Sequence, residues 1–256
     1  MLIDTHCHLD ATYFPDGPDA AIERAHAQGV DAFVVVGVGS TLEQARQAVA
    51  LAARRSDCHA VTGVHPHDAA SVDAPMLDEL ERLATSPHVV AVGEIGLDYH
   101  YLRSPREMQQ AVFRRLIGLA RALKKPIVIH TREAPEDTIA ILTEEGAKDV
   151  GGIIHCFSED RPFAQKALDL GFDLSFSGIV TFKTARSIQD VAAWAPVDRI
   201  LVETDSPYLA PIPFRGKPCE PAHVLHTARR VAELRGMSLE DLAARTSENA
   251  RRRLRF

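Results

Sequence analysis

The segment LIDTHCH at residues 2–8 has the apolar start of a β-strand but ends in two histidines. Side chains alternate along a strand, so His6 and His8 are expected to point to one face and Cys7 to the other. Two imidazoles on one face at the end of a strand are suited to holding a metal ion. Asp4 shares that face one step deeper, where we expect it to orient a metal-ligating histidine through a hydrogen bond.

Seven further segments have the pattern of strands, and amphipathic segments separate them. Several are rich in Val and Ile and apolar almost throughout, which is typical of parallel strands covered on both faces. The eight predicted strands are 2–8, 31–38, 59–66, 89–98, 126–131, 151–157, 172–178 and 199–207.

The connecting segments carry helix signals. Ser104 is predicted to cap a helix that has Pro105 at its first position and a repeat of apolar residues every three to four positions. TLEQ at 41–44 and SLED at 238–241 also indicate capped helix starts. Two helices are expected after the last strand, near 221–235 and 239–245.

Eight strand–helix units in 256 residues match a (β/α)8, or TIM, barrel in number and size. An open doubly wound sheet is the competing fold. Polar residues near the predicted strand ends favour the barrel, because those ends converge on one mouth in a barrel, whereas strands at opposite edges of an open sheet do not meet. The sequence therefore predicts an α/β protein with one barrel domain over residues 1–256. The residues that should meet at its mouth are His6, His8, His65, Glu94, His130, His155 and Asp205.

A metal centre follows from this convergence. One divalent ion can be held by His6, His8 and Asp205, and a second by His130 and His155, with Glu94 bridging the two. Histidine nitrogen suits Zn, Mn, Co or Ni, and Mg usually prefers oxygen, so the identity of the metal stays open among these five. Five other histidines, in predicted helices or connections, are expected to be structural or solvated; they are His26, His59, His88, His223 and His226.

The composition excludes several classes of protein. Apolar residues make up 46% of the chain and charged residues 25%, as in a folded globular protein. The net charge of −6 leaves no global basic footprint for nucleic acid, so contact with phosphate needs a local patch or bound cations. The four cysteines are scattered and predict no disulfide framework. We find no signal peptide and no membrane span, and expect a cytoplasmic protein without an obligate protein partner.

Seven motifs run in order along the chain: IDTHCHLD, GVHPHDA, VGEIGLDYH, HTREA, IIHCFS, ETDSPYLAP and SENARRRL. Together they resemble the TatD family of metal-dependent deoxyribonucleases along almost the whole chain. The resemblance implies a barrel related to the amidohydrolases and hydrolysis of DNA phosphodiesters, as a 3′–5′ exodeoxyribonuclease acting on single strands or 3′ ends. It places the family's metal ligands on the six residues chosen above, and a histidine of the active-site mouth on His65. One loop departs from the family pattern at Pro218 and Cys219, which puts DNA affinity in doubt.

A two-metal site would supply the nucleophile, the charge neutralisation and the help to the leaving oxygen that phosphodiester cleavage needs. Asp205 is the expected proton acceptor, with Glu94 the next candidate. Glu203 is expected to lie deeper on the same face and to support the site without direct ligation. The residues expected to hold phosphate oxygens are His65, Arg132, Arg215 and Lys217.

Two other functions stay open. A hydrolase of a small amide, ester or lactone would use the same activated water on a carbonyl. The basic residues Arg132, Arg215 and Lys217 instead favour an anionic substrate. A metal-dependent binding module without catalysis is the third possibility, and the complete ligand set argues against it. Exonuclease polarity, activity on RNA and oligomeric state do not follow from the sequence.

Overall fold

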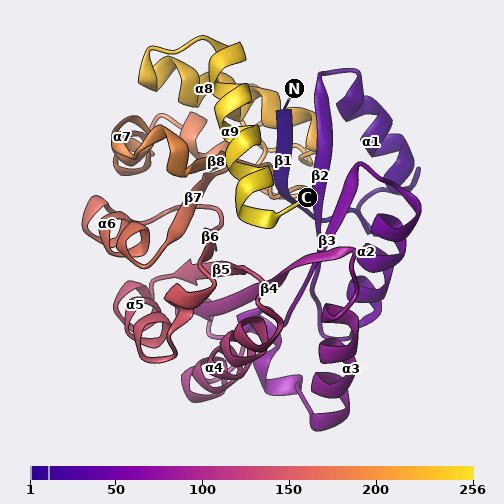
Figure 1. Ribbon diagram of the computed structural model, residues 1–256. Helices are drawn as coiled ribbons and strands as arrows, with labels where there is room; N and C mark the ends of the chain where they lie inside the picture. The colour runs from indigo at the N-terminus through magenta and orange to yellow at the C-terminus, as the bar shows by residue number, and fades with distance from the viewer. Residues whose placement is uncertain (1, 11) are drawn as a thin grey trace.

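Eight parallel strands form one sheet in chain order, and helical segments follow each of them (Figure 1). The computed structural model describes residues 2–10 and 12–256, so Met1 and Ala11, within the domain predicted over 1–256, lie outside the described residues. The strands are β1 Leu2–Cys7, β2 Val30–Gly37, β3 Cys58–Thr62, β4 Val89–Asp98, β5 Ile127–Arg132, β6 Gly152–Ile154, β7 Phe172–Phe176 and β8 Ile200–Val202. The α-helices are α1 Pro18–His26, α2 Glu43–Arg54, α3 Ala74–Ala84, α4 Arg106–Leu123, α5 Pro135–Glu144, α6 Arg161–Asp169, α7 Arg186–Trp194, α8 Val224–Arg235 and α9 Leu239–Leu254.

The sheet closes where the end of β1 meets the segment after β8. The Asp205 N–H donates to the His6 carbonyl at 2.9 Å, and the His8 N–H donates to the Ser206 carbonyl at 2.8 Å. Cys7 and Ser206 form a parallel bridge between the same two segments. The closed barrel predicted from the sequence is therefore confirmed, and the open sheet is excluded.

Side chains close the same seam deeper in the barrel. The Asp4 carboxylate accepts hydrogen bonds from the Thr204 N–H at 2.9 Å, from the Thr204 hydroxyl at 2.6 Å and from the His6 N–H at 3.3 Å. The Thr5 hydroxyl donates to the Val202 carbonyl at 3.0 Å. Burial raises the pKa of Asp4 to about 8, although these hydrogen bonds favour its anion. Asp4 thus contacts backbone and a hydroxyl, and not an imidazole as expected, because its short side chain meets the neighbouring segment first.

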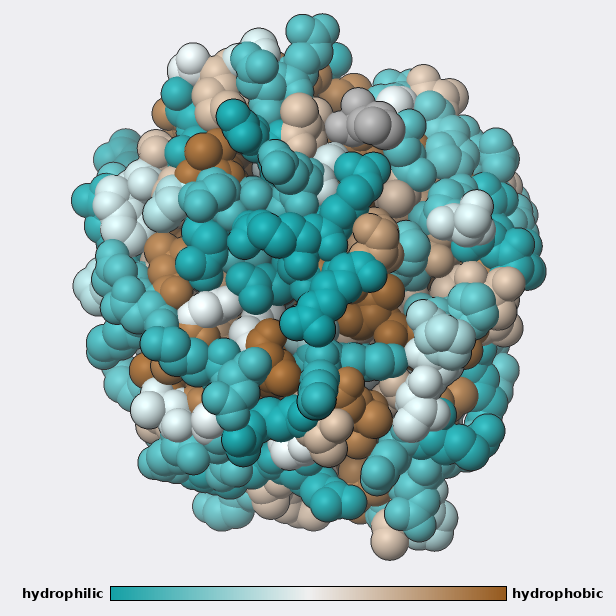
Figure 2. All heavy atoms as spheres, viewed as in Figure 1, coloured by the Kyte–Doolittle hydropathy of each residue, from teal (hydrophilic) through white to brown (hydrophobic). Residues whose placement is uncertain are grey.

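Helix α9 covers the end of the barrel at which the strands begin. Ala250 and Leu254 pack against residues of the barrel interior such as Ile3, Val34 and Leu201. In Figure 1 this helix, in yellow, lies across the ring of strands, and Figure 2 shows mostly hydrophilic side chains over the same face. The last helix was expected to end near 245, but it runs to Leu254 because its apolar residues seal the interior.

A buried carboxylate attaches α9 to the adjoining strands. Asp173 on β7 is fully buried and accepts hydrogen bonds from Arg253 at 2.7 and 2.9 Å and from Arg199, which lies just before β8. The Asn249 amide donates to the carbonyls of Val197 and Ile200, both at 2.9 Å. These contacts attach the C-terminal half of α9 to β7, to the segment before β8 and to the start of β8.

Two predicted helix starts were wrong in detail, and one is confirmed. Helix α4 begins at Arg106 with Pro105 as its cap residue, because the Ser104 hydroxyl donates to the His67 carbonyl and accepts from the Ala70 N–H. Helix α2 begins at Glu43, and Leu42 is its cap residue. The Ser238 hydroxyl caps α9 by accepting from the Asp241 N–H.

The mouth of the barrel is formed by the segments that follow the strands. The observed strands β3, β6 and β8 are shorter than predicted. His65, His155 and Asp205 were expected within these strands and lie just beyond their ends. Glu94 lies within β4, which extends further than its neighbours. Among the described residues, no helix is long and apolar enough to cross a membrane.

The packing of α9 over the end of the barrel gives a stability prediction. Leu254→Ala is expected to lower the free energy of unfolding by about 2–4 kcal/mol, because it leaves a cavity at the end of the barrel interior. Urea denaturation followed by circular dichroism measures the change. Leu102→Ala, the same change at a side chain that is 46% exposed, should stay within about 0.5 kcal/mol. Equal losses in the two variants would contradict the sealing role of α9.

Candidate metal centre

His6 at the end of β1, His8 just after it and the aspartate after β8 form one half of the site. The Asp205 Oδ1 lies 3.6 Å from the His8 Nε2 and 3.8 Å from the His6 Nε2. Asp205 has a left-handed backbone with φ of 57°, a conformation that a residue other than glycine adopts at some cost. The hydrogen bonds of the barrel seam hold it there, so closure of the barrel positions this carboxylate.

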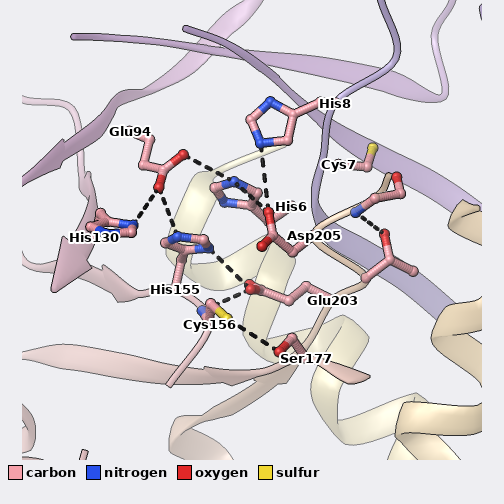
Figure 3. Close-up of polar contacts among 12 residues, drawn as sticks. His6, Cys7, His8, Glu94, His130, His155, Cys156, Ser177, Glu203 and Asp205 are labelled. Carbon is pink, nitrogen blue, oxygen red and sulfur yellow. Dashed lines mark hydrogen bonds and ion pairs between the residues drawn. The ribbon is translucent and has the colours of Figure 1, made fainter. Parts of the chain in front are cut away.

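Glu94 lies between the two halves of the site (Figure 3). Its Oε2 is 3.4 Å from the His6 Nε2. Its Oε1 is 2.9 Å from both the His130 Nδ1 and the His155 Nε2, and 3.4 Å from the His65 Nε2. One oxygen of this carboxylate thus faces His6 and the other faces a separate set of histidines, which is the arrangement expected of a ligand that bridges two metal ions.

Close backbone packing places Glu94 and His130 side by side. Gly96, two residues after Glu94 on β4, pairs with His130 on β5. Its φ is +143°, and a Cβ at this position would lie 2.0 Å from the His130 carbonyl oxygen. Only glycine therefore allows β5 to approach β4 at the level of the site.

His155 is oriented by a second buried carboxylate. The Glu203 Oε1 lies 3.1 Å from the His155 Nδ1 and accepts a hydrogen bond from the Cys156 N–H at 2.7 Å. The His155 ring stacks on the His6 ring, with centroids 3.8 Å apart. Glu203 thus lies deeper than Asp205 and contacts a candidate ligand. That it supports the site without direct ligation stays a prediction, because Glu203 also belongs to a set of possible metal donors.

Burial and the neighbouring charges set the protonation of the site. Burial alone would raise the pKa of Glu94, but the surrounding His155, His65 and His130 hold it well below its ordinary value. Burial likewise opposes ionisation of Asp205, but the hydrogen bond from His8 and the charges of His155 and His6 together outweigh it and lower the pKa. Burial lowers the pKa of His6, with His155 adding to the effect. Burial also acts to lower the pKa of His8, His130 and His155, but the neighbouring carboxylates outweigh it and raise the pKa of all three. A metal ion that binds at the site would therefore displace protons from these three imidazoles.

The donors fit a divalent cation. Both ring nitrogens of His6 are buried, and neither has a hydrogen-bond partner among the residues that the structure describes. Leaving such atoms unpaired costs about 1–3 kcal/mol, and a metal at the Nε2 would satisfy one of them. Three groups of residues could each hold a metal ion, because the donor atoms within each group lie within 4.8 Å of one another. The groups are His6, His8 and Asp205; His65, Glu94 and His130; and His6, His155 and Glu203.

Two polar residues of the site were missed from the sequence. The Asp98 Oδ2 lies 3.0 Å from the His67 Nε2 and 3.2 Å from the His130 Nε2. Asp98 could have been found, because it follows Glu94 by four residues on one strand and so shares its face. His67 follows His65 at the same spacing that identified the pair His6 and His8.

The four candidate phosphate contacts differ in position. His65 lies inside the site beside Glu94. Arg132, at the end of β5, is exposed, with its guanidinium carbon 4.6 Å from the centre of the Tyr101 ring. Arg215 lies 4.4 Å from the centre of the Phe182 ring, and Lys217 is exposed on the same loop after β8.

The loop segment that departs from the family pattern is anchored to the barrel. Cys219 is buried, and its N–H donates to the Pro207 carbonyl at 3.0 Å. Pro218 before it is exposed. The departure from the family pattern therefore includes Cys219, the residue that anchors the loop to the barrel. Arg215 and Lys217, earlier in the same loop, are exposed.

Known proteins resemble this chain over its length. A family model described as "TatD related DNase" matches residues 3–255. An uncharacterized metal-dependent hydrolase of Bacillus subtilis, YabD, is 43% identical over 257 residues, covering all of both chains. A "3′-5′ ssDNA/RNA exonuclease TatD" of Erwinia tasmaniensis is 35% identical over 257 residues, covering 98% of each. The crystal structure of YjjV, a TatD homolog from Escherichia coli, has a TM-score of 0.92 at 28% identity, covering 100% of this chain and 98% of that one.

The contact of Asp98 with two histidines gives a prediction. Asp98→Asn is expected to weaken metal affinity about 10–100-fold, because the amide keeps the size of the side chain but loses the charge that orients His130. Metal content after dialysis against graded concentrations of chelator, read by mass spectrometry, measures the change. Asp78→Asn, the same substitution at an exposed position on α3, should leave metal content unaltered. Full occupancy of both variants at every chelator concentration would remove Asp98 from the site.

Proposed function

The chain belongs to the TatD-related DNase family of metal-dependent hydrolases, and on that basis we propose that it cleaves phosphodiester bonds of single-stranded DNA from the 3′ end. The family resemblance read from the motifs is thereby confirmed. The observation that carries the proposal is the position of Glu94 between two groups of histidines at the mouth of a closed barrel. The name of the relative from Erwinia tasmaniensis supports the polarity and extends the expected substrates to single-stranded RNA.

The proposed site holds two divalent ions. His6, His8 and Asp205 would hold one ion, and Glu94 would bridge to the other. Bound there, the ions supply Lewis-acid catalysis, by activating water and neutralising phosphate charge. The remaining ligands, His130 and His155, approach the Oε1 of Glu94. His65 approaches the same oxygen, so it is a further candidate ligand besides its proposed contact with phosphate. The mixed nitrogen and oxygen donors leave Zn, Mn, Co, Ni and Mg as candidates.

Asp205 is the proposed acceptor of the proton from the attacking water. Its Oδ1 faces His6 and His8, which leaves the Oδ2 to accept a proton. The pKa of Asp205 is held below its ordinary value, so the carboxylate is ionised at neutral pH and ready for this role. Glu94, whose oxygens face imidazoles on both sides, is the second candidate.

Aromatic side chains at the rim favour a nucleic acid over a small amide or lactone. Tyr208, three residues after Asp205, is 48% exposed and contacts the His8 ring edge to face, with centroids 6.0 Å apart. Its hydroxyl bonds that of Tyr13, which is 43% exposed. Exposed aromatic rings beside a phosphodiesterase site provide surfaces on which bases stack. Arg132, Arg215 and Lys217 are the proposed contacts to neighbouring phosphates.

A substrate panel tests the proposed function. Single-stranded oligonucleotides labelled at the 5′ end are incubated with the protein and each candidate metal, beside a small lactone and an amide. We expect a ladder of products shortened from the 3′ end and no turnover of the lactone or amide. Turnover of the small carbonyl substrates alone would replace the nuclease by an amidohydrolase-type enzyme.

The proposed proton acceptor gives a mutational prediction. Asp205→Asn should reduce the rate of DNA cleavage by well over the ~10–100-fold that is typical of losing an indirect partner of a metal site. In metal-free protein at neutral pH its melting temperature should fall, because His8, His155 and His6 stabilise the Asp205 anion in the folded state and hold its pKa below the ordinary value. Melting curves and cleavage assays on the same preparation, with and without Mn²⁺, measure both effects. A folded variant with near-normal turnover would move the proton acceptor to Glu94.

The rim tyrosine gives a second prediction. Tyr208→Ala should raise the KM for a single-stranded oligonucleotide about tenfold, because stacking of one base contributes roughly 1–3 kcal/mol. Tyr208→Phe keeps the ring and should retain a KM near that of the wild type. Steady-state kinetics on the three proteins make the comparison. Equal KM values for the Ala and Phe variants would show that the ring does not contact the substrate.

A further inference from the structure

A groove of about 570 Å³ lies outside the metal centre, between the loop after β7, the loop after β8 and helix α8. Three of its lining residues are permanently cationic and one is acidic. Its lining residues are Thr181, Lys183, Gln189, Ile212, His226, Arg229, Arg230 and Glu233. Because the chain carries a net charge of −6, a groove with this excess of cations is a local exception.

Most of this positive charge is free to meet a ligand. Arg230 pairs with Glu233 at 3.2 Å, and this is the acid that lines the groove. Lys183 and Arg229 are exposed, and neither forms an ion pair within the part of the chain that the structure describes. Arg215 lies over the ring of Phe182, the residue before Lys183 in the chain, and is not one of the lining residues. The groove therefore presents two cations, Lys183 and Arg229, that form no ion pair with the described residues.

The walls of the groove are fixed by hydrogen bonds. The Gln189 amide donates to the carbonyls of Val180 and Phe182, both at 3.0 Å, which holds the loop after β7 against α7. The Thr181 hydroxyl accepts from the Ile212 N–H at 2.9 Å and joins that loop to the one after β8. A preformed groove loses little conformational freedom when it binds a ligand.

The groove is connected to the metal centre through the chain. The loop that supplies Ile212 starts at the end of β8 and carries Asp205 and Tyr208 on the way. Both loops follow the carboxyl ends of their strands, so the part of the groove that they line is at the same end of the barrel as the metal centre. A polymer that enters the metal centre past Tyr208 can therefore continue along this loop to the cations of α8.

We propose that this groove binds the backbone phosphates of the uncleaved part of a single-stranded nucleic acid whose 3′ end occupies the metal centre. This inference rests on the proposed function and adds to it a second contact region, which acts on strands too long to be held by the metal centre alone. Lys183 and Arg229 bind phosphates, and Ile212, which is 41% exposed, offers an apolar surface to a base or sugar. Such a combination of cations and apolar surface is typical of single-strand binding.

The test compares long and short substrates. The double variant Lys183→Ala/Arg229→Ala is assayed on a 20-nucleotide single strand and on a dinucleotide, beside the control variant Lys148→Ala/Arg245→Ala. Lys148 and Arg245 are exposed and lie outside the groove. Affinity for the fluorescein-labelled 20-nucleotide strand is measured by anisotropy at several salt concentrations in an Asp205→Asn background.

We expect the groove variant to bind the long strand about tenfold more weakly and to raise its KM similarly, with the dinucleotide KM unchanged. The slope of log Kd against log salt should fall by about 1.4, since each phosphate contact to a single strand contributes roughly 0.7. A groove variant that binds and cleaves the long strand like the control would overturn the proposal. If the wild type cleaves neither substrate, the proposed function fails, and the difference in Kd between the two variants still decides the groove.

Discussion

The structure depends on the seam at which β1 meets the segment after β8. Two backbone hydrogen bonds, from Asp205 to His6 and from His8 to Ser206, close the barrel. Three of these four residues are also candidate metal ligands. The contacts of Asp4 with Thr204 support the same seam from below, so the closure of the fold and the shape of the site have one structural cause.

At the centre of the site, burial and the neighbouring imidazoles have opposite effects on the ionisation of one carboxylate, Glu94. Glu94 is buried among four imidazoles, and their contacts keep it ionised where burial alone would neutralise it. Asp98 and Glu203 hold the outer nitrogens of His130 and His155, which turns the opposite nitrogens toward Glu94. A site arranged in this way can hold cations, and under the proposed function these cations would attract a polyanion to a protein whose own charge is negative.

The sequence predicted the parts of this molecule that follow from periodicity. The eight strands and the convergence of His6, Glu94 and Asp205 were accessible, because alternation along a strand and the geometry of a barrel fix which side chains meet. The contacts of Asp4 and Ser104 were not, because a short polar side chain bonds whichever backbone group the tertiary structure brings near it. The length of α9 was missed for a related reason, since its apolar face is explained only by the barrel end that it covers.

The position of α9 at the end of the chain has a consequence for folding during synthesis. His6 and Asp205 are about two hundred positions apart in the sequence, and Leu254 comes later still. During synthesis the early strands therefore emerge from the ribosome as a sheet with an open edge, which remains until β8 and the segment after it are available. The barrel interior stays unsealed for longer, until the final helix emerges. A stall in translation before α9 would leave a closed ring of strands whose apolar interior is exposed at one end, and such a chain is expected to be prone to aggregation.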